Sequence, residues 1–148
     1  MDIIRRNTDY ALRMAVELAG RFGGEPHPTK EISDRQDIPY QLACKVLQRL
    51  HKAGIVRSTM GPAGGFRLSR HPSKVTVRQV VEAIQGPVRL NRCLFARNSC
   101  CLSRRCTISP ELSRLQNKLN AFLDGLTLSR LSNAAKRTAI KKHNRSRK

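Results

Sequence analysis

Residues 55–69 read IVRSTMGPAGGFRLS and decide the fold. Two short runs suited to β-strands, 55–58 and 66–69, flank a turn over 59–65 that is rich in glycine and contains one proline. Glycine and proline in such a turn, between runs of this length, predict a β-hairpin. A hairpin that directly follows a pair of helices is the wing of a winged-helix domain, so the preceding residues test this interpretation.

The segment before the hairpin predicts three helices. Apolar residues recur at helical spacing over 8–22, with Asn7 or Thr8 as the expected cap and Gly23-Gly24 as the expected end. A short second helix opens at Thr29 and ends at the sequence 36–39.

A third helix is expected from Pro39, in its first turn, to Lys52, with Gly54 as its stop. Two helices joined by a tight turn form a helix-turn-helix. A further helix over 76–86 closes the unit, so residues 1–86 are expected to form a winged helix-turn-helix DNA-binding domain. The predicted fold class is mainly α with a small β-hairpin, followed by a C-terminal dimerisation helix.

The charge of the chain indicates a polyanionic partner. The 148 residues include 29 Lys+Arg against 10 Asp+Glu, which gives a formal net charge of +19. Such an excess favours nucleic acid. No membrane segment or secretion signal is visible, so a cytoplasmic location and no membrane partner are expected. No glycine-rich phosphate loop, HExxH or nucleophile elbow is present, and an enzyme is the least favoured class.

The expected recognition helix and wing carry the candidate DNA contacts. Arg57 and Arg67 on the hairpin are candidates for phosphate contacts, which would act alike on all sequences. Cys44 on the outward face could be a reactive thiol, and its other interpretation is a solvent-side or partly packed cysteine with no special chemistry. The outward positions of the third helix, suited to base edges and phosphates, are Gln41, Cys44, Lys45, Gln48 and Arg49.

Beyond the cysteines, residues 110–133 predict a dimerisation helix and a C-terminal helix. Ser109-Pro110-Glu111 is a good helix start. Apolar residues then step by three and four, as in a short coiled-coil seam that Asp124-Gly125 interrupts. Residues 134–148 are basic and are expected to be a disordered tail that adds salt-sensitive affinity for DNA. The seam consists of Leu112, Leu115, Leu119, Phe122 and Leu126.

Residues 87–109 form a cysteine-rich loop. Its cysteines are Cys93, Cys100, Cys101 and Cys106, and no pair has the C-x2-C spacing of a zinc ribbon. Because adjacent cysteines rarely bind one centre together, Cys93, one of the central pair, and Cys106 are the economical ligand set. Three thiolates on a loop suit an iron-sulfur cluster. Reduced unligated cysteines or a reversible thiol switch are the alternatives.

Several stretches together resemble the Rrf-type superfamily of winged-helix transcriptional regulators, which includes the IscR, NsrR and RirA types. The resemblance covers roughly residues 3–132 and implies a homodimer whose long C-terminal helices cross near a cluster that tunes DNA binding. The stretches are Thr8–Arg13, Leu50–Val56, Gly61–Leu68, Val81–Gly86 and the three-thiol loop.

The resemblance also implies a ligand set. Cys93, Cys100 or Cys101, and Cys106 match its thiolates, and Asp9 matches a carboxylate ligand supplied by the partner subunit; an ordinary first-turn acid is the other interpretation of Asp9. Ser109 stands where members with a 2Fe-2S cluster place a histidine, which favours 4Fe-4S. Met60 replaces an arginine that many members carry in the wing.

The expected function is that of a homodimeric DNA-binding regulator, a repressor, on a pseudo-palindromic operator in double-stranded DNA. An iron-sulfur cluster would sense nitric oxide, redox state or iron. The alternatives are a cluster-free regulator controlled by a thiol switch or a partner, and a basic RNA-binding protein with structural zinc.

Overall fold

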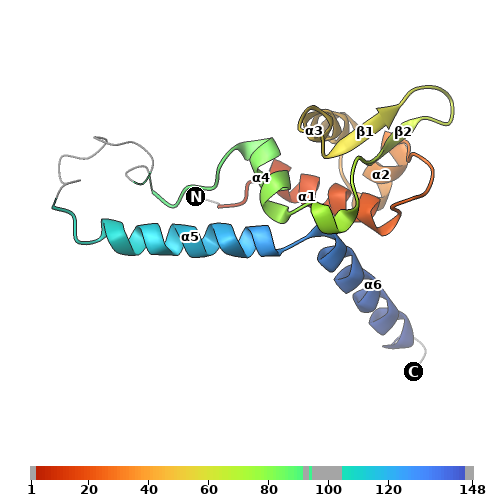
Figure 1. Cartoon of the computed structure of the whole chain (residues 1–148). Coiled ribbons are helices and arrows are strands. Elements are labelled where there is room, and N and C mark those ends of the chain that lie inside the picture. The colour runs from red at the N-terminus through yellow and green to blue at the C-terminus, as the bar shows by residue number, and fades with distance from the viewer. Residues whose placement is uncertain (1–2, 92–93, 95–104, 146–148) are drawn as a thin grey trace.

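The computed structural model describes residues 3–91, 94 and 105–145 (Figure 1). A compact group of helices and the hairpin lies on one side, and the long helix α5 runs beside α4 and away from that group (Figure 1). The elements in chain order are α1 (Arg6–Gly20), α2 (Thr29–Gln36), α3 (Tyr40–Lys52), β1 (Val56–Thr59), β2 (Gly65–Leu68), η1 (Pro72–Lys74), α4 (Val77–Gln85), α5 (Ser109–Gly125) and α6 (Leu128–Arg145).

Helix α1 is the centre of the domain. Its fully buried face of Ala11, Met14 and Ala15 follows the helical spacing of the sequence. The expected cap at Asn7 or Thr8 is wrong, because α1 already begins at Arg6 and Thr8 lies buried within its first turns. A buried threonine hydroxyl needs a partner, and that partner comes from α4 rather than from the helix itself.

Helices α2 and α3 form the predicted helix-turn-helix. Asp37 between them has φ 52° and adopts the left-handed conformation that ends α2. Pro39 stands just outside α3 as its N-cap, one position before the place expected from the sequence. Val46, Leu47 and Leu50 bury one side of α3 against the core and leave the opposite side in solvent.

Strands β1 and β2 form the predicted hairpin. They pair antiparallel, with Val56 opposite Leu68 and Arg57 opposite Arg67. The backbone of His27 pairs with Phe66, so the loop between α1 and α2 extends the wing by one bridge. Gly65 is required at this crossing, because a Cβ atom there would lie 2.2 Å from the carbonyl oxygen of His27.

Helix α4 closes the domain and binds the C-terminal segment. Thr76 and Gln79 form a reciprocal capping box at its start, as expected for a helix opening at Thr76. The Val77 amide then donates to the Leu126 carbonyl at 2.8 Å, and the Leu128 amide donates to the Val75 carbonyl at 2.9 Å. Leu128 is fully buried in the same core as α1, so the winged-helix core also includes residues beyond the predicted boundary at 86.

The predicted seam residues of α5 are partly buried against the domain and partly exposed to solvent. Leu123 and Gln116 are the residues it buries, whereas Leu115 and Phe122 are 52% and 65% exposed. Leu112 and Leu119 are half-buried between these two faces. The helix ends at Gly125, as the Asp124-Gly125 sequence predicted.

Helix α6 differs from the disordered tail that the sequence predicts for residues 134–148. It continues through Arg145 rather than stopping near residue 133. Its start is anchored by buried Leu128, and the following residues are mostly alanine, lysine and arginine, which have high helix propensity. Within the described parts of the chain, no helix has the length and apolar character that a membrane crossing requires.

Candidate nucleic-acid interface

The solvent-facing side of α3 is polar and carries no acidic residue. Gln41, Lys45, Gln48 and Arg49 are exposed, as predicted, and Cys44 is half-buried among them. Lys45, Gln48, Arg49 and Lys52 line a shallow depression of about 290 Å³. Amide and cationic donors on one helix face are the groups that base edges and phosphates accept.

Sequence reasoning missed one residue of this surface, Tyr40. It is the first residue of α3 and half of it is exposed. A side-chain hydrogen bond with Cys44 raises the pKa of the Tyr40 hydroxyl. A large aromatic residue directly after the Pro39 cap was the signal available in the sequence.

Arg49 lies at the edge of the surface, where α3 meets α4. Its guanidinium donates to the carbonyl oxygen of Ile84 at 3.4 Å. This contact, although long, relates the position of the recognition helix to the end of α4.

The wing presents two arginines directly opposite each other, Arg57 and Arg67. Two like charges at facing positions of a hairpin repel each other unless an anion lies between or beside them. In the part of the chain that the structure describes, neither pairs with a carboxylate, and the buried Nε of Arg67 has no hydrogen-bond partner. Met60, at the wing tip, is 97% exposed.

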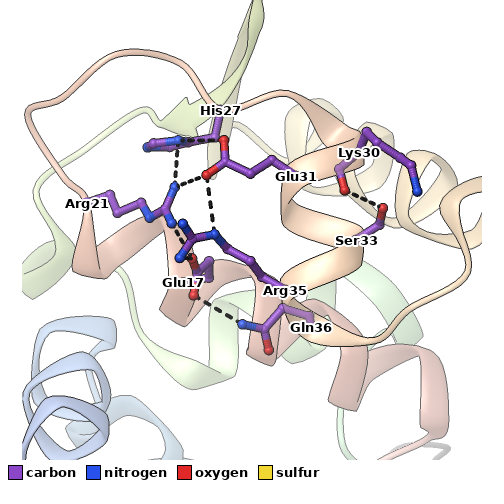
Figure 2. Close-up of polar contacts among 8 residues, drawn as sticks. All are labelled: Glu17, Arg21, His27, Lys30, Glu31, Ser33, Arg35 and Gln36. Atoms are coloured by element: carbon purple, nitrogen blue, oxygen red, sulfur yellow. Dashed lines mark hydrogen bonds and ion pairs between the residues drawn. The ribbon is translucent and has the colours of Figure 1, made fainter. Parts of the chain in front are cut away.

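A cluster of charged side chains joins α2 and the loop before it to α1 (Figure 2). Arg21 lies 3.1 Å from Glu17 and also binds Glu31. Glu31 in turn lies 3.5 Å from His27 and 3.3 Å from Arg35. The hydrogen bond from Arg21 holds the pKa of Glu31 below its usual value, although burial acts in the opposite direction.

This ion-pair cluster joins α1 to α2 next to the wing. Its members come from α1, α2 and the loop between them, and the same His27 that joins the cluster pairs its backbone with the wing. Sequence reasoning did not detect the cluster, because its charged residues occupy several elements and only their packing brings them together.

The structure describes only part of the predicted metal site. Cys93, Cys100 and Cys101 lie outside the described residues. Cys106 has a half-buried thiol without a disulfide, just before α5. Among the residues described, no group of three or more histidine, cysteine, aspartate or glutamate side chains could hold a metal ion. The ligand set stays a prediction.

Asp9 lies apart from Cys106 in the sequence, on the first turn of α1. Its carboxylate is exposed and is 3.9 Å from the guanidinium of Arg13. Within the described residues Arg13 is the ion-pair partner of this exposed carboxylate, and the role of Asp9 as a ligand stays a prediction.

Comparison with known proteins places the chain in a family. Residues 4–134 match the Rrf2 family model, described as an iron-dependent transcriptional regulator. The chain belongs to the Rrf2 family. This assignment confirms the resemblance inferred from the wing and helix motifs.

Two curated Rrf2-family relatives are HTH-type transcriptional regulators named IscR. The protein of Aliivibrio salmonicida (strain LFI1238) is 31% identical over 122 residues, which cover 82% of this chain and 72% of the relative. The protein of Escherichia coli O1:K1 / APEC is 31% identical over 124 residues, which cover 84% and 76%.

Solved structures confirm the Rrf2-type winged-helix fold. CymR (YrzC), the global cysteine regulator of B. subtilis, superposes with a TM-score of 0.74 at 23% identity and covers 90% of this chain and 98% of that protein. T. potens IscR has a TM-score of 0.70 at 22% identity, with coverage of 89% and 87%. At these identities the likeness concerns the fold.

Proposed function

We propose that this Rrf2-family protein is a homodimeric repressor that binds a pseudo-palindromic operator in double-stranded DNA and is controlled by an iron-sulfur cluster. The observation that carries DNA binding is the acid-free outer face of α3 beside the opposed arginines of the wing. In a winged helix the recognition helix occupies the major groove and the wing approaches the backbone or minor groove. Lys45 and Gln41 then face base edges, while Arg57 and Arg67 face phosphates.

The apolar stripe on α5 supports a second copy of this chain as the dimer partner. Ile108, Leu115 and Phe122 recur every seven residues and are 64%, 52% and 65% exposed. Half-buried Leu112 and Leu119 lie between them at the alternating spacing of a coiled-coil seam. Two such helices crossing would cover surface that is costly to leave in water.

The proposed cluster is of the 4Fe-4S type, because Ser109 stands where the resemblance places the histidine of 2Fe-2S members. The chemistry of the donors fits, because Cys106 offers a free thiol and soft thiolates suit iron-sulfur centres. Cys93, Cys100 or Cys101, and Cys106 would hold the cluster, with Asp9 of a second subunit as fourth ligand. A bound cluster would supply chemistry that reacts with nitric oxide or oxidants and depends on iron supply.

The position of Cys106 suggests how the cluster would control DNA binding. Cys106 stands three residues before α5, the helix that carries the apolar stripe. A change in ligation at Cys106 therefore acts at the start of the helix that spaces the two recognition helices. The cluster controls the operator only to the extent that it favours one dimer geometry over another.

A thiol switch without a cluster is the second candidate. It is favoured by the superposition on CymR, which includes the oxidised form of Staphylococcus aureus CymR at a TM-score of 0.69. Oxidation of two cysteines in the segment would then replace loss of the cluster as the event that changes the dimer. Metal-free protein with full, oxidant-sensitive operator affinity would favour this candidate.

The test begins with anaerobic purification, analysis of iron and acid-labile sulfide, and a visible absorption spectrum before and after nitric oxide. An operator is selected from a random-sequence DNA pool, and a duplex RNA of matched length is the competitor. We expect near-equal amounts of iron and sulfide in the protein. Nitric oxide should reduce the visible absorbance, and the affinity for the operator should change at the same time. A colourless protein after anaerobic reconstitution, or preference for the RNA, would contradict the proposal.

Matched variants test the DNA-binding surface and the metal ligands separately. Lys45→Ala on α3 should weaken operator binding, whereas Lys118→Ala on the exposed side of α5 should leave it unchanged. Cys106→Ser should lower iron content, whereas Cys44→Ser should not. Loss of iron in both cysteine variants would contradict the assignment of Cys106 as a ligand.

A further inference from the structure

A buried glutamine of α5 binds residues 88–90, the start of the cysteine segment, which we call the stem. Gln116 is 4% exposed. Its side-chain oxygen accepts from the Leu90 amide at 2.9 Å, and its side-chain nitrogen donates to the Val88 carbonyl at 2.9 Å. The same nitrogen donates to the Asn120 side-chain oxygen at 3.0 Å. One donor at the oxygen and two acceptors at the nitrogen define the orientation of the amide.

The two bonds make the Gln116 side chain act as a short piece of strand beside the stem. Both the C=O of Val88 and the N–H of Leu90 are paired by one side chain, as they would be by a neighbouring backbone. An aliphatic side chain would fill the space but would leave both groups without these partners. Gln116 therefore has a specific role in fixing residues 88–90, separate from the Arg78–Asp124 ion pair at 2.9 Å that also joins α4 to α5.

The fixed stem belongs to the same packing unit as α4. Val88 is buried with Val81 of α4 and Leu123 of α5 in one apolar cluster. At the other end of α4, the Val77 amide bonds to the Leu126 carbonyl at 2.8 Å. Helix α4 is thus held to α5 at both ends, by Gln116 through the stem and by Leu126.

From α4 the contacts continue to the DNA-binding elements. Gln85, the last residue of α4, accepts from the Arg5 amide at 3.0 Å and from the Thr8 hydroxyl at 2.7 Å, at the start of α1. Ile84 accepts from Arg49 of α3. A displacement of residues 88–90 would therefore be transmitted through α4 to α1 and to the recognition helix.

We propose that Gln116 is the positioning residue that couples the cysteine segment to the winged-helix domain. This inference rests on the proposed function, since it explains how a change among the cysteines reaches the operator. Cys106 lies at the end of the cysteine segment that leads into α5, and Leu90 lies at the end that follows α4. Gln116 of α5 binds the backbone of Leu90, so it connects the two ends. When the conformation of the segment changes, the stem and α4 move with α5 only while the hydrogen bonds from Gln116 to Val88 and Leu90 are intact.

The experiment compares Gln116→Met with Gln116→Glu. Methionine has a similar length but removes the hydrogen bonds to Leu90, Val88 and Asn120, whereas glutamate retains an acceptor for Leu90 and loses the donor to Val88. Asn117→Ala, an exposed neighbour on α5, is the matched control. Full-length protein is studied in cluster-loaded and iron-free forms, and three quantities are measured. They are amide hydrogen exchange at Leu90, visible absorbance per iron, and the ratio of operator Kd between the two forms.

For Gln116→Met we expect exchange at Leu90 to rise roughly tenfold, as for loss of one buried hydrogen bond. Absorbance per iron should match the wild type, because no ligand is changed, while the Kd ratio falls toward one. Gln116→Glu should lie between, and Asn117→Ala should match the wild type. If Gln116→Met does not fold, the Gln116→Glu protein decides the outcome alone.

The outcomes distinguish the inference from the proposed function. A wild-type Kd ratio of one would overturn the proposed control by the cluster. A wild-type ratio well above or below one that both Gln116 variants retain would overturn the coupling role of Gln116 and leave the proposed function standing.

Discussion

The hydroxyl of Thr8 in α1 donates a hydrogen bond to the side-chain oxygen of Gln85 at the end of α4 at 2.7 Å, across 77 positions of sequence. The same oxygen accepts from the Arg5 amide, and the side-chain nitrogen of Gln85 donates to the Ile3 carbonyl at 2.8 Å. The start of α1 is therefore capped by a residue of another helix. This arrangement ties the first and last helices of the sequence-predicted domain.

Replacement of Thr8 by valine should expose the energetic role of this contact. Valine has nearly the same shape, but it leaves the side-chain oxygen of half-buried Gln85 without one of its donors, so we expect the free energy of unfolding to fall by about 1–2 kcal/mol. Urea unfolding followed by circular dichroism measures it. Asn7→Ala, at an exposed neighbouring position, is the control, and equal stability of Thr8→Val and the wild type would contradict the prediction.

Replacement of Gly65 by alanine should damage the wing. The added Cβ would lie 2.2 Å from the His27 carbonyl oxygen, which cannot move without breaking the bridge to Phe66. We expect a loss of about 2 kcal/mol or more in unfolding free energy and weaker DNA binding. Gly24→Ala is the matched control, because its Cβ would meet only Arg21 at 3.4 Å. Similar stability of the two variants would refute this account of the crossing.

An acidic residue on the α5 stripe should separate the subunits. Phe122→Asp places a charge on surface that the proposed partner covers, so we expect monomers in sedimentation velocity where the wild type sediments as a dimer. Asn117→Asp, an exposed position about 200° round the helix from Leu115, should leave the mass unchanged. A dimer that persists in Phe122→Asp would show that another surface joins the subunits.

The wing should determine part of the salt dependence of DNA binding. Arg57→Ala removes one proposed phosphate contact per subunit and should reduce the slope of log K against log salt by about 0.9 per wing. Met60→Arg should increase it by a similar amount, because Met60 already lies at the exposed wing tip. Titrations at several salt concentrations measure both slopes. Unchanged slopes would mean that the wing does not reach the backbone.

The ion-pair cluster predicts a loss of stability in acid. Because Arg21 lowers the pKa of Glu31 in the folded protein, Glu31 stabilises the fold above its ordinary pKa of 4.5, and this contribution disappears as the pH falls through the lower folded value. Glu31→Gln should therefore be less stable than the wild type at pH 7, and the difference should shrink by pH 3. Unfolding free energies at both pH values provide the test.

Glu111→Gln is the control for the acid experiment, since Glu111 lies exposed on α5 and pairs with exposed Arg114. A difference between wild type and Glu31→Gln that is as large at pH 3 as at pH 7 would contradict the role assigned to the charge of Glu31.

The helix-turn-helix and the wing were predictable because their signals are local. Asp37 and Gly54 follow the helices they end, and the 59–65 turn contains the glycines that the hairpin needs. The exposed positions of α3 also followed from spacing, since Val46 and Leu50 mark the buried side. The roles of these exposed residues in DNA binding, and of the cysteines and Asp9 in metal binding, stay predictions.

The remaining features depend on partners far away in sequence. The cap of α1 comes from Gln85, and the helical tail starts from a leucine, Leu128, that is buried by another part of the chain. Helix α5 illustrates the difference best: its leucines recur at coiled-coil spacing, yet within one chain Gln116 is buried and Phe122 is exposed. The sequence by itself determined the elements and the family, because helical periodicity and turn chemistry act over a few residues. The tertiary structure decided which face of each element is covered, because burial depends on what packs against it.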